Sequence, residues 1–344
     1  MEKDQHLMEL PTKVLIGEGV IEKLGSFVEE ASTSKKIVVV SGKNVKDALK
    51  ERVESSIKNL HWIEITEPDM ENVEKVLRES KDAGSIVGIG GGKSVDVAKL
   101  AAYIAGLRFY SVPTSASHDG IASPFASLRG TSRPYSEKAK PPYGILADVG
   151  IIASAPKRLL AAGCGDLVSK LTAVKDWQLA RDEIGEYYGN YAASLALMSA
   201  SVVLSVKESV TFTTENVRNI VEALISAGVA AGIAGSSRPC SGSEHLFSHY
   251  LDVIAPNSGL HGEKCGIGTI MMAKLHGLDW ENVRLSLMNF GAPVSASQIG
   301  ITESQVISSL MNASSIRPER YTILSKIKLT KDSAYQLAHS THVV

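Results

Sequence analysis

The sequence is short of cysteine, of net charge and of long apolar runs, and each shortage excludes a class of protein. Only three cysteines occur in 344 residues: Cys164, Cys240 and Cys265. Their number is odd and no two have Cys-x-x-Cys spacing. This argues against a disulfide framework and suits a reducing cytoplasm.

Charge and hydropathy point to an ordinary soluble globular protein. The formal net charge is −1 and no basic block stands out, so neither nucleic acid nor an anionic membrane is expected as the main partner. The first residues, MEKDQHLMEL, contain no apolar core of a signal peptide, so we expect no secretory signal. The longest apolar stretches, such as 229–234, are too short to span a bilayer, so no membrane insertion is expected.

The length predicts two domains, and the first part of the chain alternates strand-like and helix-like segments. KKIVVVSG, at 35–42, is a β-branched run typical of a buried parallel strand. The segment after it has an apolar stripe at helical spacing: Val45, Leu49, Val53 and Ile57. The alternation continues through HWIEITEP, ENVEKVLRESKDAG, SIVGIGGGKS, DVAKLAAYIAG and RFYSVPT. It predicts a parallel, doubly wound α/β sheet.

The rest of the chain has a different pattern. Residues 125–147 carry turn formers and short β runs, which predict a hairpin that returns to the first domain. From residue 155 onward, Ala, Leu, Val and Ser segments with helical periodicity dominate. We therefore expect an α/β domain over residues 1–154 and an all-helical domain over residues 155–344.

A cluster of glycines, GIGGGKSVD at 88–96, lies where a predicted strand ends and a helix begins. It is not a Walker A loop, because position 87 is valine, and it is not GxGxxG, because position 93 is Lys93. Glycines at such a place let a pyrophosphate approach backbone N–H groups, and the helix dipole favours the anion. The segment is therefore either a nonstandard phosphate-binding turn or a tight turn needed only for packing.

The next strand ends in PTSASHDGIASPFAS, at the same carboxyl edge of the predicted sheet. The hydroxyl groups of Thr114, Ser115 and Ser117 could hydrogen-bond a ribose or a nicotinamide. Asp119 would follow at the lip that faces a second domain. The alternative is a polar loop in which this aspartate only caps a turn.

Three histidines occur close together in the second half. SGSEHLFSHYLD predicts a helix capped by Ser241 or Ser243, with His245 and His249 on one face at i, i+4. Two histidines so placed can bind zinc, but the order of residues is not HExxH, which excludes that metalloprotease motif. LHGEKCGIG places His261 just before another helix.

A metal site needs a further ligand, and two candidates stand in the sequence. Cys265 follows His261 at i+4, so a His–Cys pair is one possibility. In AAGCGDLVSKLTAVKDW, Asp166 follows a glycine-containing turn on the early turn of a predicted helix and could supply a carboxylate. Each residue taken alone is more often structural, and the metal hypothesis depends on their occurring together in the helical half.

These motifs, taken in order, resemble a known family. GGGKSVDVAK, TSASHDGIAS, GDLVSK, EHLFSH and HGEKCGIG are similar to those of the iron- and zinc-dependent polyol dehydrogenase superfamily and, within it, to the archaeal sn-glycerol-1-phosphate dehydrogenase family. The resemblance runs from about residue 90 to residue 268. It implies a Rossmann-like N-terminal domain and an all-helical C-terminal domain, as in dehydroquinate synthase and glycerol dehydrogenase.

The resemblance also implies site residues. NAD or NADP is expected on Gly90, Gly91, Gly92, Lys93, Ser94, Asp96, Thr114, Ser115, Ser117 and Ser123. The metal positions are matched by Asp166, His245 and His261, and the substrate-contacting, catalytic positions by Asp119 and His249. Iron-using relatives have a fourth ligand, a histidine, where this chain has Lys170, and three ligands with an open place suit catalytic Zn2+. Two histidines and a carboxylate also suit iron(II).

The implied reaction is the interconversion of dihydroxyacetone phosphate and sn-glycerol 1-phosphate, which supplies the backbone of archaeal membrane lipids. Arg238, Lys170 and Lys264 are candidates for the substrate phosphate, and Lys43 or Lys46 for the 2′-phosphate of NADP. Alternatives are a glycerol dehydrogenase, a dehydroquinate-synthase-like lyase and a catalytically silent nucleotide-binding protein. We expect a cytoplasmic homo-oligomer whose partner is a small phosphorylated triose or polyol.

Overall fold

The structure is a computed structural model that describes residues 7–29, 36–128 and 137–344. These residues form two compact units. The first unit comprises the described part of Met1–Pro156 together with Phe212–Gly235, and the second comprises Lys157–Thr211 and Ser236–Val344.

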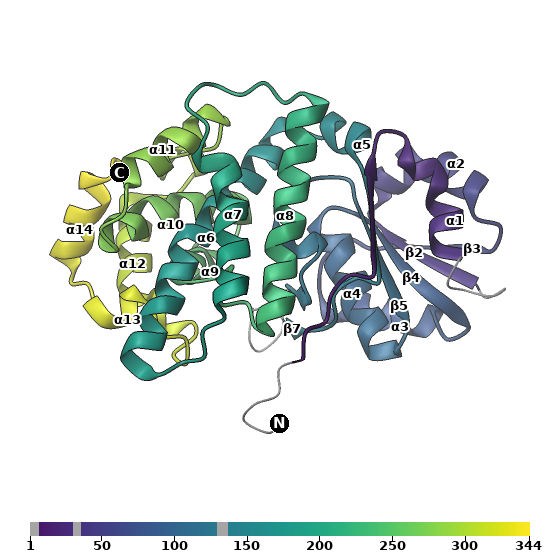
Figure 1. The fold of residues 1–344 in the computed structure, drawn as a ribbon, viewed down its shortest axis with the longest axis horizontal. Coiled ribbons are helices and arrows are strands. Elements are labelled where there is room, and N and C mark those ends of the chain that lie inside the picture. The colour runs from purple at the N-terminus through teal and green to yellow at the C-terminus, as the bar shows by residue number, and fades with distance from the viewer. Residues whose placement is uncertain (1–6, 30–35, 129–136) are drawn as a thin grey trace. The chain divides into compact units, whose positions relative to one another are not determined.

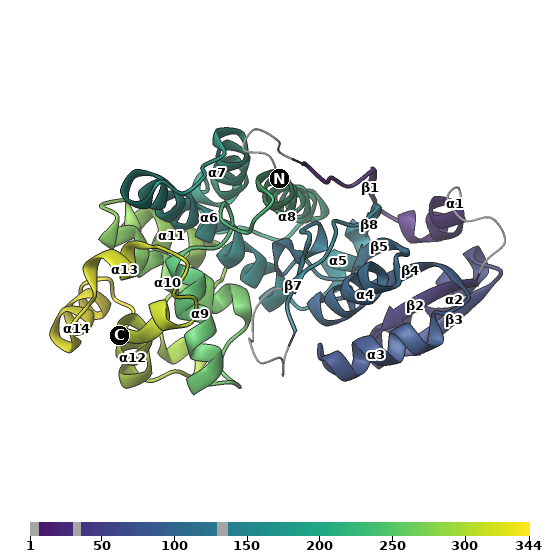
Figure 2. The ribbon, with the colours of Figure 1, turned by 90° about the horizontal axis from the view of Figure 1, so that it is seen from below.

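The first unit contains a six-stranded sheet in the order β1-β8-β5-β4-β2-β3, and all six strands are labelled in Figure 2, beside the general view of Figure 1. Its strands are β1 (Lys13–Gly17), β2 (Lys36–Ser41), β3 (Leu60–Glu64), β4 (Ala83–Gly90), β5 (Arg108–Pro113) and β8 (Gly144–Asp148). Every pairing in it is parallel. The predicted parallel α/β sheet is confirmed.

Both faces of this sheet are covered by helices, which explains why its strands are apolar throughout. The helices are α1 (Leu24–Glu29), α2 (Lys43–Ser56), α3 (Met70–Glu79), α4 (Gly92–Ala105) and α5 (Val149–Ser154). In β2, Val38 and Val40 pack into one apolar core with residues of α3 and α4. Val39 packs into the opposite core with Leu49 and Val53 of α2, as the helical stripe predicts.

The predicted hairpin forms from β6 (Phe125–Ala126) and β7 (Glu137–Lys138), which pair antiparallel. Of the residues that join them, 129–136 lie outside the described part of the chain. The chain then returns to the main sheet as β8, between β1 and β5.

Helix α8 (Thr214–Ala234) belongs to the first unit, although its place in the sequence is within the predicted helical domain. A Cβ on Gly228 would lie 2.6 Å from the backbone nitrogen of Ser123, and one on Gly232 would lie 2.7 Å from the carbonyl oxygen of Glu9. Glycine at these positions therefore lets α8 approach the unit closely. The helix is long and apolar enough to cross a bilayer. However, 72% of its most apolar 18-residue stretch is buried in the protein, as in the core helix of a soluble protein. Division of the sequence at residue 154 stays a prediction.

The second unit, residues 157–211 and 236–344, is fully described and consists of helices joined by loops, with no strand (Figure 2). Its α-helices are α6 (Lys157–Ile184), α7 (Asn190–Leu204), α9 (Ser243–Ile254), α10 (His261–Leu275), α11 (Trp280–Asn289), α12 (Glu303–Asn312), α13 (Ile323–Ile327) and α14 (Lys331–Ser340). Helices α6, α9 and α10 pack against one another at its centre, and they carry all the predicted metal ligands.

Candidate functional site

Helices α6 and α10 cross at glycine residues beside two predicted ligands. A Cβ on Gly165 would lie 2.1 Å from the carbonyl oxygen of Gly262, and one on Gly262 would lie 1.9 Å from the carbonyl oxygen of Ala162. Only glycine permits this backbone approach. Asp166 and His261 directly adjoin these glycines in the sequence, so the crossing brings both to one place.

The expectation that Asp166 follows a turn is wrong. It lies well inside α6, which runs unbroken for 28 residues. The glycines before Asp166 permit close packing against another helix and do not form a turn. The local sequence alone does not distinguish these two uses of glycine.

Gly262→Ala is expected to destabilise the second unit by about 2 kcal/mol or more, because the new methyl group must displace the backbone of α6. It is also expected to weaken metal binding, since Asp166 and His261 move apart. Urea unfolding and zinc titration would measure the two effects. Gly42→Ala is the control, because the nearest atom to its added Cβ is 3.9 Å away. Unfolding and titration curves equal to those of the control would contradict the packing role.

His245, on α9, is oriented by the residue before it. Its Nδ1 lies 2.8 Å from Oε1 of Glu244, which is fully buried and also accepts bonds from the backbone N–H of Gly242 at 2.7 Å and the hydroxyl of Thr172 at 2.8 Å. The other nitrogen, Nε2, faces Asp166 Oδ1 at 3.6 Å. A carboxylate that hydrogen-bonds to one ring nitrogen leaves the other nitrogen available to bind a metal. Metal-binding histidines usually have such a partner. Glu244 is not among the predicted site residues, and its only signal in the sequence is its position next to His245.

Neither serine predicted to cap α9 does so. The N-cap is Gly242, and no side chain makes the cap hydrogen bond. The backbone N–H groups at the start of the helix, which have no partner within it, are bonded to carboxylates instead: that of Gly242 to Glu244, and that of Ser243 to Asp176 Oδ2 at 2.6 Å. Buried carboxylates replace the expected hydroxyl cap and hold the helix that carries His245.

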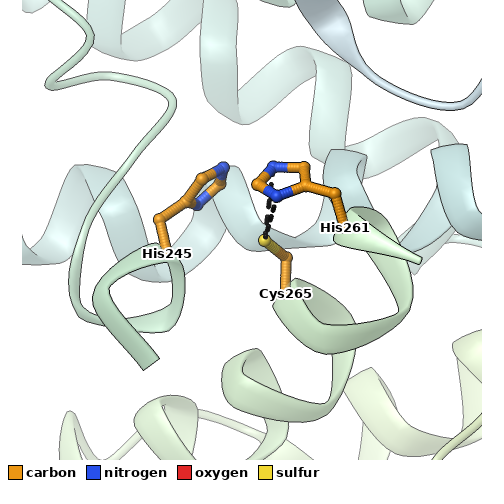
Figure 3. Close-up of side chains that lie close together, drawn as sticks. All are labelled: His245, His261 and Cys265. Atoms are coloured by element: carbon orange, nitrogen blue, oxygen red, sulfur yellow. Dashed lines mark hydrogen bonds between the residues drawn. The ribbon is translucent and has the colours of Figure 1, made fainter. Parts of the chain in front are cut away.

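Three side chains converge in the second unit (Figure 3). One ligand atom from each of His245, His261 and Cys265 lies within 4.8 Å of the others. His245 comes from α9, and the other two come from successive turns of α10, where Cys265 Sγ is 3.6 Å from His261 Nε2. Imidazole, thiolate and carboxylate are all ligands that zinc accepts, so this chemistry fits a divalent metal. Both predicted third ligands, Asp166 and Cys265, are therefore near the histidine pair.

His249 lies beside this cluster without being one of its members. Its ring centroid is 6.2 Å from that of His245 and 5.8 Å from that of His261, with the latter rings stacked. Its Nδ1 is 3.7 Å from Oδ2 of Asp252. Burial lowers the pKa of His249 to about 4, so the ring is neutral near pH 7 and has a lone pair to accept a proton.

Burial and neighbouring groups shift the pKa values of the cluster in different directions. Burial opposes ionisation of Asp166, but the Lys170 ammonium, 2.8 Å away, and the hydrogen bond with His245 hold the pKa of Asp166 well below its ordinary value. Burial also opposes protonation of His245, yet Cys265 and the bond to Asp166 raise its pKa well above the usual value. For His261, burial and the neighbouring His245 both lower the pKa. A metal that binds His245 must therefore displace a proton.

The three cations named for a substrate phosphate all have protein partners. Each pairs with a carboxylate: Lys170 with Asp166, Lys264 with Asp252, and Arg238 with Glu186. A phosphate at any of them would have to compete with, or share, that partner.

In the first unit, the glycine turn and the end of β5 lie side by side, as the sequence predicts. Gly90, at the end of β4, has φ +150°, a conformation that requires glycine. The backbone N–H of Thr114 donates to the carbonyl oxygen of Gly90 at 3.0 Å, and a Cβ on Gly91 would lie 3.3 Å from Ser115 Oγ. Two of the predicted cofactor segments thus meet at the carboxyl edge of the sheet.

Several predicted cofactor residues use their side chains within the protein. Lys93 Nζ lies 2.9 Å from Glu67 Oε1, in the loop after β3. Asp96 is buried and accepts from Lys99 Nζ at 3.0 Å and from the backbone N–H of Ser127 at 3.1 Å. Ser123 Oγ accepts from the backbone N–H of Phe125 at 3.2 Å. Their predicted roles stay predictions. Asp119 begins a 3-10 helix, Asp119–Ile121, after the segment of Thr114 and Ser117.

Known proteins resemble this chain in sequence and in fold. A sequence profile described as iron-containing alcohol dehydrogenase matches residues 15–156. The glycerol-1-phosphate dehydrogenase (NAD(P)+) of Nitrosopumilus maritimus is 50% identical over 98% of this chain and 97% of its own, and that of Cenarchaeum symbiosum is 51% identical over the same shares. A probable glycerol dehydrogenase from Sinorhizobium meliloti, 23% identical, has the same fold with a TM-score of 0.79 over 98% of both chains. The chain therefore belongs to the glycerol-1-phosphate dehydrogenase family.

Proposed function

We propose that this chain interconverts dihydroxyacetone phosphate and sn-glycerol 1-phosphate with NAD or NADP, and so supplies the backbone of archaeal membrane lipids. The observation that carries the proposal is identity near 50% over the full length of relatives named for this activity. The converging histidines of the second unit are consistent with a metal-assisted redox reaction.

Asp166, His245 and His261 are the residues proposed to hold a Zn2+ ion, with Cys265 as the alternative third ligand. When bound, the metal supplies a Lewis acid for the C2 carbonyl, and the dinucleotide supplies the hydride. Glu244 accepts from Nδ1 of His245 and so leaves Nε2 as the nitrogen that would hold an ion. Lys170 keeps Asp166 ionised.

His249 and Asp119 are proposed to act on the substrate. A neutral imidazole at His249 can accept the proton of the C2 hydroxyl during oxidation and return it during reduction. The Asp119 carboxylate can orient a substrate hydroxyl group by accepting its hydrogen bond. Both residues would therefore position the substrate or move its proton, and neither would bind the metal.

The dinucleotide is proposed to lie at the carboxyl edge of the sheet in the first unit, with its pyrophosphate at the turn Gly90–Gly92. Lys46, a candidate for the 2′-phosphate of NADP, pairs with Glu64 at 2.6 Å, whereas Lys43 is exposed. A 2′-phosphate would therefore meet Lys43 directly and compete with Glu64 for Lys46. We further propose a cytoplasmic homo-oligomer, since helices rich in Ala and Ser permit close packing between subunits.

The proposal predicts that dihydroxyacetone phosphate oxidises NADH or NADPH at least about 100-fold more efficiently than dihydroxyacetone, because the phosphate contributes binding energy to the transition state. Cofactor absorbance with purified, zinc-loaded protein measures both rates. A preference for the unphosphorylated ketone would indicate a glycerol dehydrogenase. Absence of net cofactor oxidation would indicate a lyase or a silent binding protein.

A further inference from the structure

The imidazole of His118 occupies a slot formed by two glycines of the first unit. A Cβ on Gly92 would lie 2.2 Å from Nε2 of this ring, and one on Gly120 would lie 2.5 Å from its Nδ1 and Cε1. Real side-chain carbons do not approach so closely, so any other residue at either position would displace the ring. Gly92, one of the four glycines at the turn, is thus needed for contact with a histidine.

The hydrogen bonding of this ring identifies its protonated nitrogen. The backbone N–H of Gly120 donates to His118 Nδ1 at 3.0 Å. A nitrogen that accepts a hydrogen bond carries a lone pair, so in the neutral ring the proton is on Nε2. Nε2 is also the atom that lies against Gly92, the first residue of α4. The ring therefore presents an N–H donor beside the glycine turn.

The turn has one cationic side chain of its own, and that side chain is bonded elsewhere. Lys93 is the only lysine or arginine among residues 88–96. Its Nζ donates to Glu67 Oε1 at 2.9 Å and to the carbonyl oxygen of Thr66 at 3.3 Å, both after β3. An anionic ligand at the turn would therefore depend on backbone N–H groups and on a donor from another segment.

We propose that His118 Nε2–H is the side-chain donor to the pyrophosphate of the dinucleotide, a role that extends the cofactor site and rests on the proposed function. The backbone N–H of Gly120 fixes the tautomer in which Nε2 carries the proton. The lack of a side chain at Gly92 lets the ring lie against the turn. The next residue, Asp119, is proposed to contact substrate, so a bound cofactor would also fix the segment that carries it. His118 is not among the predicted site residues, because a histidine in a polar loop has no spacing signal in the sequence.

Equilibrium binding of ADP-ribose and of adenosine, each by displacement of NADH fluorescence, tests this role. ADP-ribose contains the pyrophosphate and adenosine does not. His118→Ala is expected to weaken ADP-ribose binding about tenfold or more, as loss of a hydrogen bond to a charged group does, while adenosine binding changes less than about twofold. His118→Gln, whose amide nitrogen can take the place of Nε2, is expected to recover part of the loss.

His61→Gln is the matched control, because His61 is a half-exposed histidine of the same unit, at the start of β3 and bonded to Glu79. It is expected to bind both ligands as the unaltered protein does. Equal losses for ADP-ribose and adenosine would mean that His118 only supports the loop. Unchanged or tighter ADP-ribose binding would mean that the ring makes no contact or obstructs the site. Each of these results overturns the inference, whereas failure of the unaltered protein to bind NADH would overturn the cofactor site itself.

Discussion

Replacing His261 with alanine is expected to remove both the bound metal and turnover. The kcat should fall about a thousandfold or more, since a Lewis acid contributes several kcal/mol to the transition state. Zinc content by atomic absorption and cofactor oxidation with dihydroxyacetone phosphate measure the two losses. His339→Ala is the control in the same unit, because His339 is a partly exposed residue paired with Glu303 on the outer helices. Normal zinc stoichiometry and activity in the His261 variant would contradict the site.

Two further substitutions decide which third ligand the metal uses. If Asp166 is the ligand, Asp166→Asn loses the metal and Cys265→Ser keeps it. The opposite result would assign the thiolate, which the structure places 3.6 Å from His261 Nε2. Cobalt substitution adds an independent measure, because thiolate coordination gives a charge-transfer band that carboxylate coordination does not.

Asp176→Ala is expected to cause the largest loss of stability. This carboxylate is fully buried and accepts four hydrogen bonds: from the Ser243 backbone N–H at 2.6 Å, the Ser243 hydroxyl at 2.5 Å, the Ile323 backbone N–H at 2.7 Å and His276 Nε2 at 3.0 Å. It joins α6 to α9, α13 and the end of α10. Removing it leaves several buried donors without a partner, which costs about 3–5 kcal/mol.

Chemical unfolding of the metal-free protein, followed by far-UV circular dichroism, measures this change. Asp182→Ala is the control, since Asp182 is an exposed acid on the same helix, bonded to its neighbour Arg181. Little change is expected there. If the two variants unfolded at the same urea concentration, Asp176 would not be the anchor of α9. The metal site should weaken with Asp176→Ala as well, because α9 carries His245.

Much of the fold could be predicted because the information is local. The β-branched run of β2 and the apolar stripe of α2 follow from the periodicity of consecutive residues, and both elements form where expected. Helix α8 has the same apolar character as any core helix, so its periodicity could not indicate that it packs with the first unit. Only its glycines, which match close backbone neighbours, carry that information.

The site was predictable in its residue types and less so in its geometry. The spacing of His245 and His249 predicted a shared helix face, and the structure has both on α9. Which of them faces a metal depends on Glu244, Asp166 and His261, and the last two come from other helices. The crossing at Gly165 and Gly262 is likewise a tertiary contact. Such pairings depend on how helices meet, which consecutive residues do not specify.

The most direct test of the account is the stereochemistry of the reduced product. Dihydroxyacetone phosphate is incubated with NADPH and zinc-loaded protein, and the product is analysed with enantiomer-specific enzymes. Stoichiometric cofactor oxidation and formation of sn-glycerol 1-phosphate are expected. Formation of sn-glycerol 3-phosphate, or product without cofactor oxidation, would contradict this expectation.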